Sequence, residues 1–213
     1  MAEKKEKKTQ TISAEARQLA AIAYGESSAK NDPDEMYALA SVLVRQRDAR
    51  GYKDIMSFAA REKTFAFAAS DGNDRYGHLM SASEADIERS PGMKTAVSAA
   101  DNALTGGVDK SNGAYFWDGA DIKSNYKRHF KVRRGIKFTD PSHNIYGISE
   151  STKIEIKYRT TKSKDRATGK ITAHREEVGR YDHQFDSTAA YGGTIFWKLN
   201  PQFLEVTHGW EYK

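Results

Sequence analysis

The sequence predicts an α+β protein with a helical first part and a β-rich tail. Over roughly the first hundred residues, apolar side chains recur at three- and four-residue spacing, the pattern of a helix with one buried face. After residue 150, apolar and polar residues alternate, the pattern of a half-buried strand. Hydrophobic residues make up 38% of the 213 residues, which is enough to build a core, and charged residues make up 30%.

Two long helices are expected near the start of the chain. The first begins after Ser13, whose hydroxyl can cap the free N–H groups of the first turn. Its apolar stripe consists of Ala16, Leu19, Ile22 and Ala23. In the second helix Asp32 is the expected N-cap and Pro33 the first helical residue. Glu35 is expected to reach back to the cap and complete a capping box.

Glycines and polar segments mark the remaining boundaries of the helical part. Gly51 is expected to end the second helix, because glycine readily adopts the left-handed backbone found after helices. A shorter helix is expected at 54–61, a polar loop at 70–77 and a last helix from Pro91 to the glycine pair at 106–107.

Five short segments are expected to be extended. Their ranges are 113–117, an aromatic run, and 154–158, 171–173, 194–197 and 203–206. Ile154, Ile156 and Tyr158 alternate with polar residues, which predicts a strand with one buried face. A polar turn is expected at 162–169.

Composition excludes several classes of protein. The absence of cysteine excludes disulfides, thiolate metal sites and a cysteine nucleophile. No apolar run approaches the roughly 18–20 residues of a membrane-spanning helix. Residues 1–10 are a lysine- and glutamate-rich tract without the apolar centre of a signal peptide, and we expect a disordered leader or linker there.

The chain carries a net charge of +5 that is unevenly distributed. Residues 123–137 contain seven lysines and arginines and no acid. Such a block suits an anionic partner, which could be nucleic acid, acidic lipid or bacterial wall polymer. The alternative is a solvated basic loop that only aids solubility.

Several common catalytic schemes are missing. The chain lacks a Gly-x-Ser-x-Gly elbow, a phosphate-binding loop and a His-Glu-x-x-His motif. The six histidines show no metal-ligand spacing, so neither a metal nor another cofactor is expected.

Glu26 is the first candidate catalytic residue. It continues the apolar stripe of the first helix, four residues after Ile22. Burial at such a position raises the pKa of a carboxyl group and lets it serve as a general acid on a glycosidic oxygen. Gly25 is expected to leave space for a substrate backbone. Alternatively, the helix frays before Glu26 and the side chain faces water.

A second carboxylate and an aromatic run complete the candidate site. Glu35 can cap its helix and still face a cleft, where it would direct a water or stabilise a developing positive charge. Aromatic faces stack on sugar rings, so Tyr115 and Trp117 are expected to bind a glycan, although part of the run 115–117 must also enter the core. Asp118 is a further polar candidate beside them.

Several segments follow one another in a recognisable order. They are Ala23-Tyr24-Gly25-Glu26, then Val42-Leu43-Val44-Arg45, Thr64-Phe65-Ala66-Phe67, Ala103-Leu104-Thr105-Gly106 and Gly113-Ala114-Tyr115-Phe116. In this order, over about residues 15–120, the chain resembles the germination-type (spore-cortex-lytic) cell-wall hydrolases of the lysozyme-like superfamily. Each motif is short, and their shared order carries the resemblance.

The resemblance implies a lysozyme-like fold that cleaves the glycan strands of peptidoglycan, with Glu26 as the catalytic acid and Tyr24 beside it in the substrate site. The chain departs from the family at Gly25 and Val44, where alanine and asparagine are usual, and it lacks the acid that usually follows the first glutamate. Glu35 has no family counterpart. We expect residues 11–150 to form this catalytic domain and residues 151–213 to be a β-rich extension packed on the same domain.

These features predict a muramidase that cleaves the bond between N-acetylmuramic acid and N-acetylglucosamine. The alternatives are a lytic transglycosylase acting on the same bond and a non-catalytic basic module that binds peptidoglycan or nucleic acid. The basic charge and charged leader also resemble antibacterial effectors delivered by a type VI secretion machine to the periplasm or wall of a target bacterium. An immunity protein and a component of that machine would then be partners, and nucleic acid would not.

Overall fold

A computed structural model describes residues 11–213 and confirms the α+β class. The leader expected at 1–10 lies outside the described residues. The chain divides into two compact units, residues 1–110 and 111–213. This boundary falls well before the one expected between residues 150 and 151. No helix within residues 11–213 is long and apolar enough to cross a membrane.

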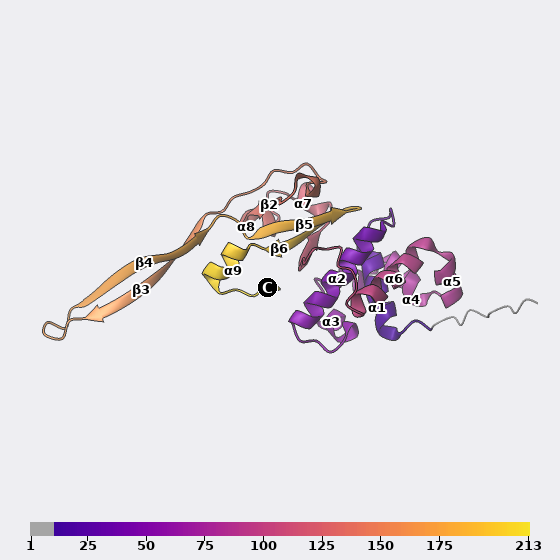
Figure 1. Ribbon diagram of the computed structural model, residues 1–213, viewed down its shortest axis with the longest axis horizontal. Helices are drawn as coiled ribbons and strands as arrows, with labels where there is room; N and C mark the ends of the chain where they lie inside the picture. The colour runs from indigo at the N-terminus through magenta and orange to yellow at the C-terminus, as the bar shows by residue number, and fades with distance from the viewer. Residues whose placement is uncertain (1–10) are drawn as a thin grey trace, which may run out of the picture. The chain divides into compact units, whose positions relative to one another are not determined.

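The first unit is helical (Figure 1). Its elements are α1 (Ala14–Glu26), α2 (Pro33–Ala49), α3 (Ile55–Arg61), the short 3-10 helix η1 (Phe67–Ala69), α4 (Asp74–Ser81), α5 (Glu84–Arg89) and α6 (Pro91–Leu104). Helix α1 packs against α2, α4 and α6. The predicted apolar stripes supply the core, in which Leu19, Ile22, Met36 and Leu39 are fully buried.

The predicted helix starts are confirmed by their capping bonds. The Ser13 hydroxyl accepts from the Ala16 N–H at 3.1 Å. Asp32 Oδ1 accepts from the N–H groups of Asp34 and Glu35 at 3.0 and 3.4 Å. Gly51 has a φ of +73° just after α2, as its expected stop role requires.

The polar loop predicted at 70–77 is shorter in the structure, because a helix begins inside this range. Helix α4 begins at Asp74 because the Asn73 side chain accepts from the Tyr76 N–H at 3.0 Å and caps the new helix. Four of the residues assigned to the loop are therefore helical. The sequence of α4 is rich in polar residues and contains a glycine, so its composition is that of a loop.

The second unit combines short helices with two sheets. Its elements are β1 (Phe116–Asp118), α7 (Asp121–Ser124), α8 (Phe130–Arg134), β2 (Ile136–Lys137), the 3-10 helix η2 (Pro141–His143), β3 (Glu155–Lys164), β4 (Ile171–Tyr181), β5 (Phe185–Tyr191), β6 (Thr194–Leu199) and α9 (Pro201–Thr207). The four-stranded sheet has the order β1-β6-β5-β2, and β3 and β4 form a separate two-stranded sheet.

The pairing of the four-stranded sheet explains the early boundary between the units. Strand β1 is antiparallel to β6, and β2 is parallel to β5. Residues before and after position 150 therefore share one sheet and one core. The buried members of that core are Ile122, Val132, Ile136, Ile148, Phe185, Ile195, Trp197 and Leu199.

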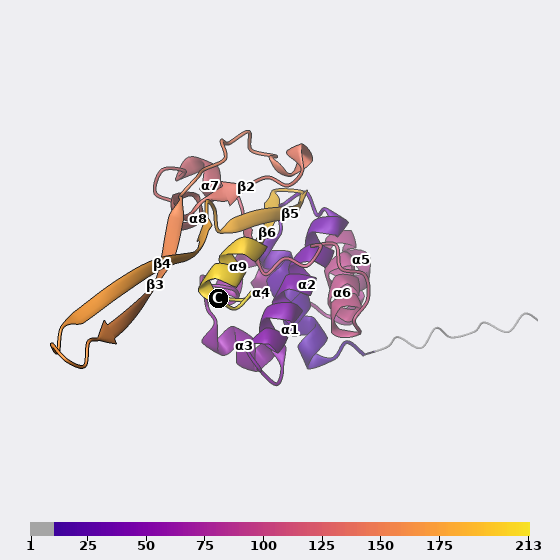
Figure 2. The ribbon, with the colours of Figure 1, turned by 60° about the vertical axis from the view of Figure 1, so that its left-hand side comes forward.

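Two strand predictions in the tail are corrected. Residues 203–206 belong to helix α9, because Asn200 caps it and Pro201 takes the first helical position. The predicted strand at 154–158 overlaps β3 from Glu155 onward, but its apolar residues are not buried. Ile156 and Tyr158 are 36% and 42% exposed, and Ile154, just before β3, is 67% exposed. Figures 1 and 2 both show β3 and β4 running out from the four-stranded sheet of the same unit, and helix α9 packs on β4 near its base.

Candidate functional site

The six expected site residues fall into two groups. Tyr24, Glu26 and Glu35 belong to the first unit, and Tyr115, Trp117 and Asp118 belong to the second. In the first unit the groups gather where α1 ends and the loop to α2 begins. We call Tyr24, Glu26, Glu35, Asn73 and Arg75 the α1-end cluster.

Glu26 is the last residue of α1 and is partly exposed. Its Oε1 accepts a hydrogen bond from the Ala68 N–H in η1 at 2.8 Å. Two electrostatic influences on this carboxylate oppose each other. The C-terminal end of a helix dipole disfavours negative charge, whereas the N–H donor favours it. The helix does not fray before this position, and the side chain is held in a defined place at the rim of the unit.

Glu35 lies inside the first unit with none of its surface exposed. Its Oε2 accepts from the Ser28 N–H at 3.0 Å and from the Ser28 hydroxyl at 2.7 Å. The sequence predicted that the Glu35 carboxylate would accept a hydrogen bond from the Asp32 N–H. The bonds from Ser28 instead direct Oε2 to the loop after Glu26. A side chain enclosed in this way has no face to present to a glycan, so its place in the site is to hold Ser28.

Gly25 serves packing within the protein. A Cβ atom at this position would lie 2.7 Å from the Ala68 Cβ, 3.1 Å from the Asn73 Oδ1 and 3.2 Å from the Tyr76 Cβ. The space expected for a substrate backbone is therefore filled by η1 and α4. This close approach is what brings the Ala68 N–H to the Glu26 carboxylate.

Two residues of the cluster were not singled out from the sequence. Arg75 Nε donates to the Tyr24 carbonyl at 2.8 Å, and its guanidinium lies over the Tyr24 ring at 3.9 Å from the centroid. Asn73 Nδ2 donates to the Gly25 carbonyl at 3.2 Å. Both side chains satisfy carbonyls that the end of α1 leaves without helical partners. The polar composition of 70–77 was the one signal that could have found them.

In the second unit Asp118 is buried instead of lining an open surface. It is 8% exposed, and its Oδ1 lies 2.8 Å from Nζ of Lys131, which is 3% exposed. The His129 Nε2 lies 3.3 Å from the same oxygen and 3.4 Å from the Asp121 Oδ2. The Lys131 ammonium also donates to the Trp117 carbonyl at 3.2 Å.

Asp118, Asp121 and His129 are the one group within residues 11–213 whose ligand atoms are close enough to share a metal ion. The Lys131 ammonium already neutralises Asp118 at hydrogen-bond distance, and a second positive charge beside it is unfavourable. We therefore assign Asp118 and Lys131 a structural role as a buried ion pair, whereas Asp121 is exposed. Three aromatic rings surround the ammonium, with centroids 4.9–5.9 Å away: Phe116, Phe130 and Phe185.

Side chains in the aromatic run at 115–117 alternate between two faces, as they do in a strand. Phe116 packs on the core of the second unit, and its ring meets Phe185 edge-on at 5.8 Å. Tyr115 and Trp117 have the opposite parity, and all three aromatic residues are partly exposed.

The basic block at 123–137 is folded and is not a loop. It contains α7, α8 and β2, and its apolar positions at Val132 and Ile136 enter the core. Lys131 is buried against Asp118, as described above. The other six basic side chains of the block are exposed: Lys123, Lys127, Arg128, Arg133, Arg134 and Lys137.

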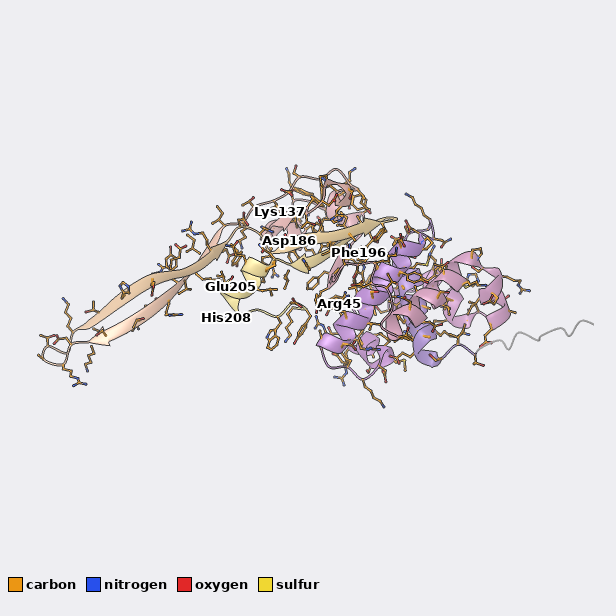
Figure 3. The ribbon with its side chains drawn as sticks, in the orientation of Figure 1. Arg45, Lys137, Asp186, Phe196, Glu205 and His208 are labelled. Carbon is orange, nitrogen blue, oxygen red and sulfur yellow. The ribbon has the colours of Figure 1, made fainter. Side chains whose placement is uncertain are left out.

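A second buried histidine lies between two carboxylates. His183 Nδ1 is 2.6 Å from Asp182 Oδ1, and its Nε2 is 2.8 Å from Asp186 Oδ1, on strand β5 (Figure 3). The hydrogen bond to Asp186 raises the pKa of His183, with Asp182 acting in the same direction against the effect of burial. These two contacts join β5 to the segment before it.

Comparison of the chain with known proteins finds no matching family model, no matching curated protein and no matching solved structure.

Proposed function

We propose that the first unit cleaves the glycan strands of peptidoglycan and that Glu26 is the general acid. The observation that carries the proposal is the position of its carboxylate. It stands partly exposed at the end of a buried helix, and the Ala68 N–H orients one oxygen. A general acid needs this combination of access to substrate and fixed geometry. The ordered resemblance of residues 15–120 to cell-wall hydrolases supplies the substrate class.

In this proposal the remaining groups of the α1-end cluster position Glu26. Asn73 and Arg75 fix the last carbonyls of α1, and Glu35 fixes the loop at Ser28. Glu26 would protonate the oxygen between N-acetylmuramic acid and N-acetylglucosamine as that bond breaks. Tyr24 would contact the glycan beside it.

A lytic transglycosylase acting on the same bond is the second candidate. Hydrolysis with a second carboxylate requires a group that directs water, and Glu35 is enclosed. A transglycosylase manages with one acid, because the hydroxyl of the muramic acid itself attacks. The burial of Glu35 favours this candidate.

The test compares Glu26→Gln with Glu35→Gln in purified full-length protein added to peptidoglycan sacculi. We expect Glu26→Gln to abolish fragment release while the thermal unfolding midpoint stays within a few degrees of wild type. Glu35→Gln should retain measurable activity and lower the unfolding midpoint. Mass spectrometry of the released fragments separates the two candidates, because transglycosylation leaves anhydro-muramyl ends and hydrolysis leaves reducing ends. Full activity in Glu26→Gln would falsify its assignment as the acid.

The alternative of another class is a basic module that binds wall polymer or nucleic acid without cutting it. Wild-type protein that binds sacculi and releases no fragments would establish that alternative. The proposed setting is an antibacterial effector delivered to the wall of a target bacterium, with an immunity protein as its neutralising partner. Protection of target cells by such a protein, and loss of toxicity in Glu26→Gln, would support that setting.

A further inference from the structure

Strands β3 and β4 form a two-stranded arm, and no other strand within residues 11–213 pairs with it. We call residues 155–181 the β3–β4 arm. Its antiparallel register runs from Glu155 opposite Tyr181 to Lys164 opposite Ile171, with one irregularity between Lys157 and Tyr158. Every side chain from 158 to 178 is exposed. Residues 158–178 therefore add no core, and a two-stranded ribbon by itself is only marginally stable in water.

Both ends of the arm are nonetheless well defined. At the base, a Cβ on Gly179 would lie 2.6 Å from Val206 of α9, and the Tyr181 ring meets Phe203 edge-on at 5.0 Å. At the tip, Asp165 Oδ1 accepts from the N–H groups of Ala167 and Thr168 at 2.9 and 2.7 Å. Helix α9 packs against the base, and a hydrogen-bonded turn joins the strands at the tip. Specific contacts therefore fix both ends of the arm.

The positive charge of the chain is concentrated in the outer part of this arm. Residues 159–175 contain six lysines and arginines and one acid, a net charge of +5 that equals the net charge of the whole chain. The second unit holds 18 lysines and arginines against 12 acids, whereas the first unit holds 16 against 17. The one acid, Asp165, is engaged in the tip turn. The outer arm thus carries an excess of positive charge, although Arg159 lies opposite Glu176 at its inner end.

Three of these charges lie on one face of the ribbon. The pairing places Lys162, Lys164 and Arg175 on that face, because cross-strand partners and alternate residues share a face. On the other face Arg159 lies opposite Glu176. Figure 3 shows side chains standing out from both sides of the ribbon.

The outer basic residues are open to a partner. Within residues 11–213, none of the six lysines and arginines at 159–175 forms an ion pair. The guanidinium of Arg175 lies over the Tyr158 ring, 3.7 Å from its centroid, which presents a flat cationic and aromatic surface. Arginine and lysine form charge-assisted hydrogen bonds with carboxylates, and arginine can do so through two parallel bonds.

We propose that the outer β3–β4 arm, residues 158–175, binds the carboxylate-bearing peptides of peptidoglycan and tethers the chain to the polymer. The choice of polymer rests on the proposed function of the first unit. A planar lipid surface would contact one face, and its apolar side chains would need to be separated from the charges. Here Ile171 lies opposite Lys164 on the same face.

Tethering also has a physical advantage for an enzyme that acts on an insoluble polymer. A second contact in the same chain raises the effective concentration of the catalytic unit near its substrate. Binding through exposed charges is weakened by salt, because ions screen such contacts beyond about 8 Å at physiological ionic strength. The tether should therefore be reversible and sensitive to salt.

The experiment measures co-sedimentation of the full chain with purified sacculi. The arm variant is Lys162→Gln, Lys164→Gln, Lys170→Gln and Arg175→Gln combined. The matched control is Lys123→Gln, Lys127→Gln, Arg128→Gln and Arg133→Gln combined, which removes the same number of positive charges from the exposed basic block of the same unit. We expect the arm variant to bind about tenfold more weakly than wild type and the control to change less than about threefold.

A second comparison uses sacculi whose carboxyl groups have been coupled to a neutral amine. Wild-type binding should fall to the level of the arm variant on these sacculi. Equal losses in the arm variant and in the matched control would overturn the proposal, because net charge alone would then explain binding. Unchanged binding to the blocked sacculi would also overturn it. Duplex DNA and anionic lipid vesicles are the competing ligands. Arm-dependent binding to either one that is tighter than binding to sacculi at the same salt concentration would show that peptidoglycan is not the partner.

Binding and cutting are measured separately, so the two proposals fail separately. If the arm holds sacculi but the wild-type chain releases no fragments, the proposed function is wrong and the carboxylate-binding arm stands. If the chain releases fragments but the arm variant binds as wild type does, the arm proposal is wrong. Cleavage of short soluble wall fragments should be the same in the arm variant and in wild type, because such fragments need no tether.

Discussion

The buried carboxylate of Glu35 holds Ser28 through two hydrogen bonds, one to its N–H at 3.0 Å and one to its hydroxyl at 2.7 Å. This contact joins the start of α2 to the loop that follows Glu26. The position of the proposed acid thus depends on a second carboxylate that is itself enclosed. The dependence can be tested by stability as well as by activity.

Replacing Glu35 by Gln should lower the free energy of unfolding by about 1–3 kcal/mol, because a buried acceptor loses charge-assisted bonds. Chemical denaturation of the full chain would measure the change. The control is Glu88→Gln, at a carboxylate 57% exposed in an ion pair with Lys94, which should change stability by less than about 0.5 kcal/mol. Equal effects in both variants would contradict the holding role of Glu35.

Gly25→Ala should destabilise the first unit by about 1–3 kcal/mol, because the new methyl group would overlap Ala68 of η1 and force it away from α1. Under the proposed function, this variant should also lose activity, since η1 carries the N–H that orients Glu26. Gly77→Ala is the matched control. Gly77 is helical, and a Cβ there has no atom within 4 Å, so alanine should stabilise by about 0.4–1 kcal/mol. Thermal unfolding should show a lower midpoint for Gly25→Ala and a higher midpoint for Gly77→Ala than for wild type.

Lys131→Met should cost about 3–5 kcal/mol, because it leaves the Asp118 carboxylate buried without its positive partner. The double variant Lys131→Met with Asp118→Asn should lose less than the sum of the single variants. A double-mutant cycle in urea measures this coupling. Lys127→Met, at an exposed position of the same basic block, should be close to neutral. Additive single effects would show that the ion pair is not coupled.

Removing His183 should change how stability depends on pH. Folding raises its pKa above the ordinary value of 6.5, chiefly through the bond to Asp186. Its contribution to stability is therefore complete below about pH 6.5 and is lost as the pH rises through the higher folded-state value. The unfolding midpoint of His183→Gln should fall furthest below wild type at pH 5.5, and the gap should narrow by pH 8.5.

The matched control for this pH series is His174→Gln, at an exposed histidine of the β3–β4 arm. Its unfolding midpoint should follow that of wild type at every pH. A gap between His183→Gln and wild type that widens with rising pH would have the wrong sign. It would show that the folded state does not hold a proton on His183.

Much of the helical part could be predicted from the sequence because its signals are local. Ser13, Asp32 and Asp54 cap the helices that follow them, and Gly51 ends the one before it. Each of these residues acts on backbone groups within a few positions along the chain. The helix at 201–207 has the same kind of local signal in Asn200 and Pro201. The strand predicted at 203–206 was wrong because this cap and the proline start a helix, whatever the apolar pattern that follows them.

The candidate site could be predicted only in part. Glu26 was found because it continues an apolar stripe, but its bond to Ala68 joins residues far apart in the chain. The burial of Glu35 and the role of Gly25 depend on which elements pack against them. Arg75 and Asn73 were missed because their partners are the end carbonyls of another helix.

Local pattern alone determined where α1, α2, α3 and α6 begin, which face of each is apolar, and that the tail contains strands. Those properties follow from backbone bonds and side-chain periodicity over a few neighbouring residues. Tertiary structure alone decided that residues 111–150 join the tail in one unit, that Asp118 and Glu35 are enclosed, and that the basic β3–β4 arm stands uncovered. Burial and charge pairing depend on residues distant in the chain, and a linear pattern cannot specify which of them will meet.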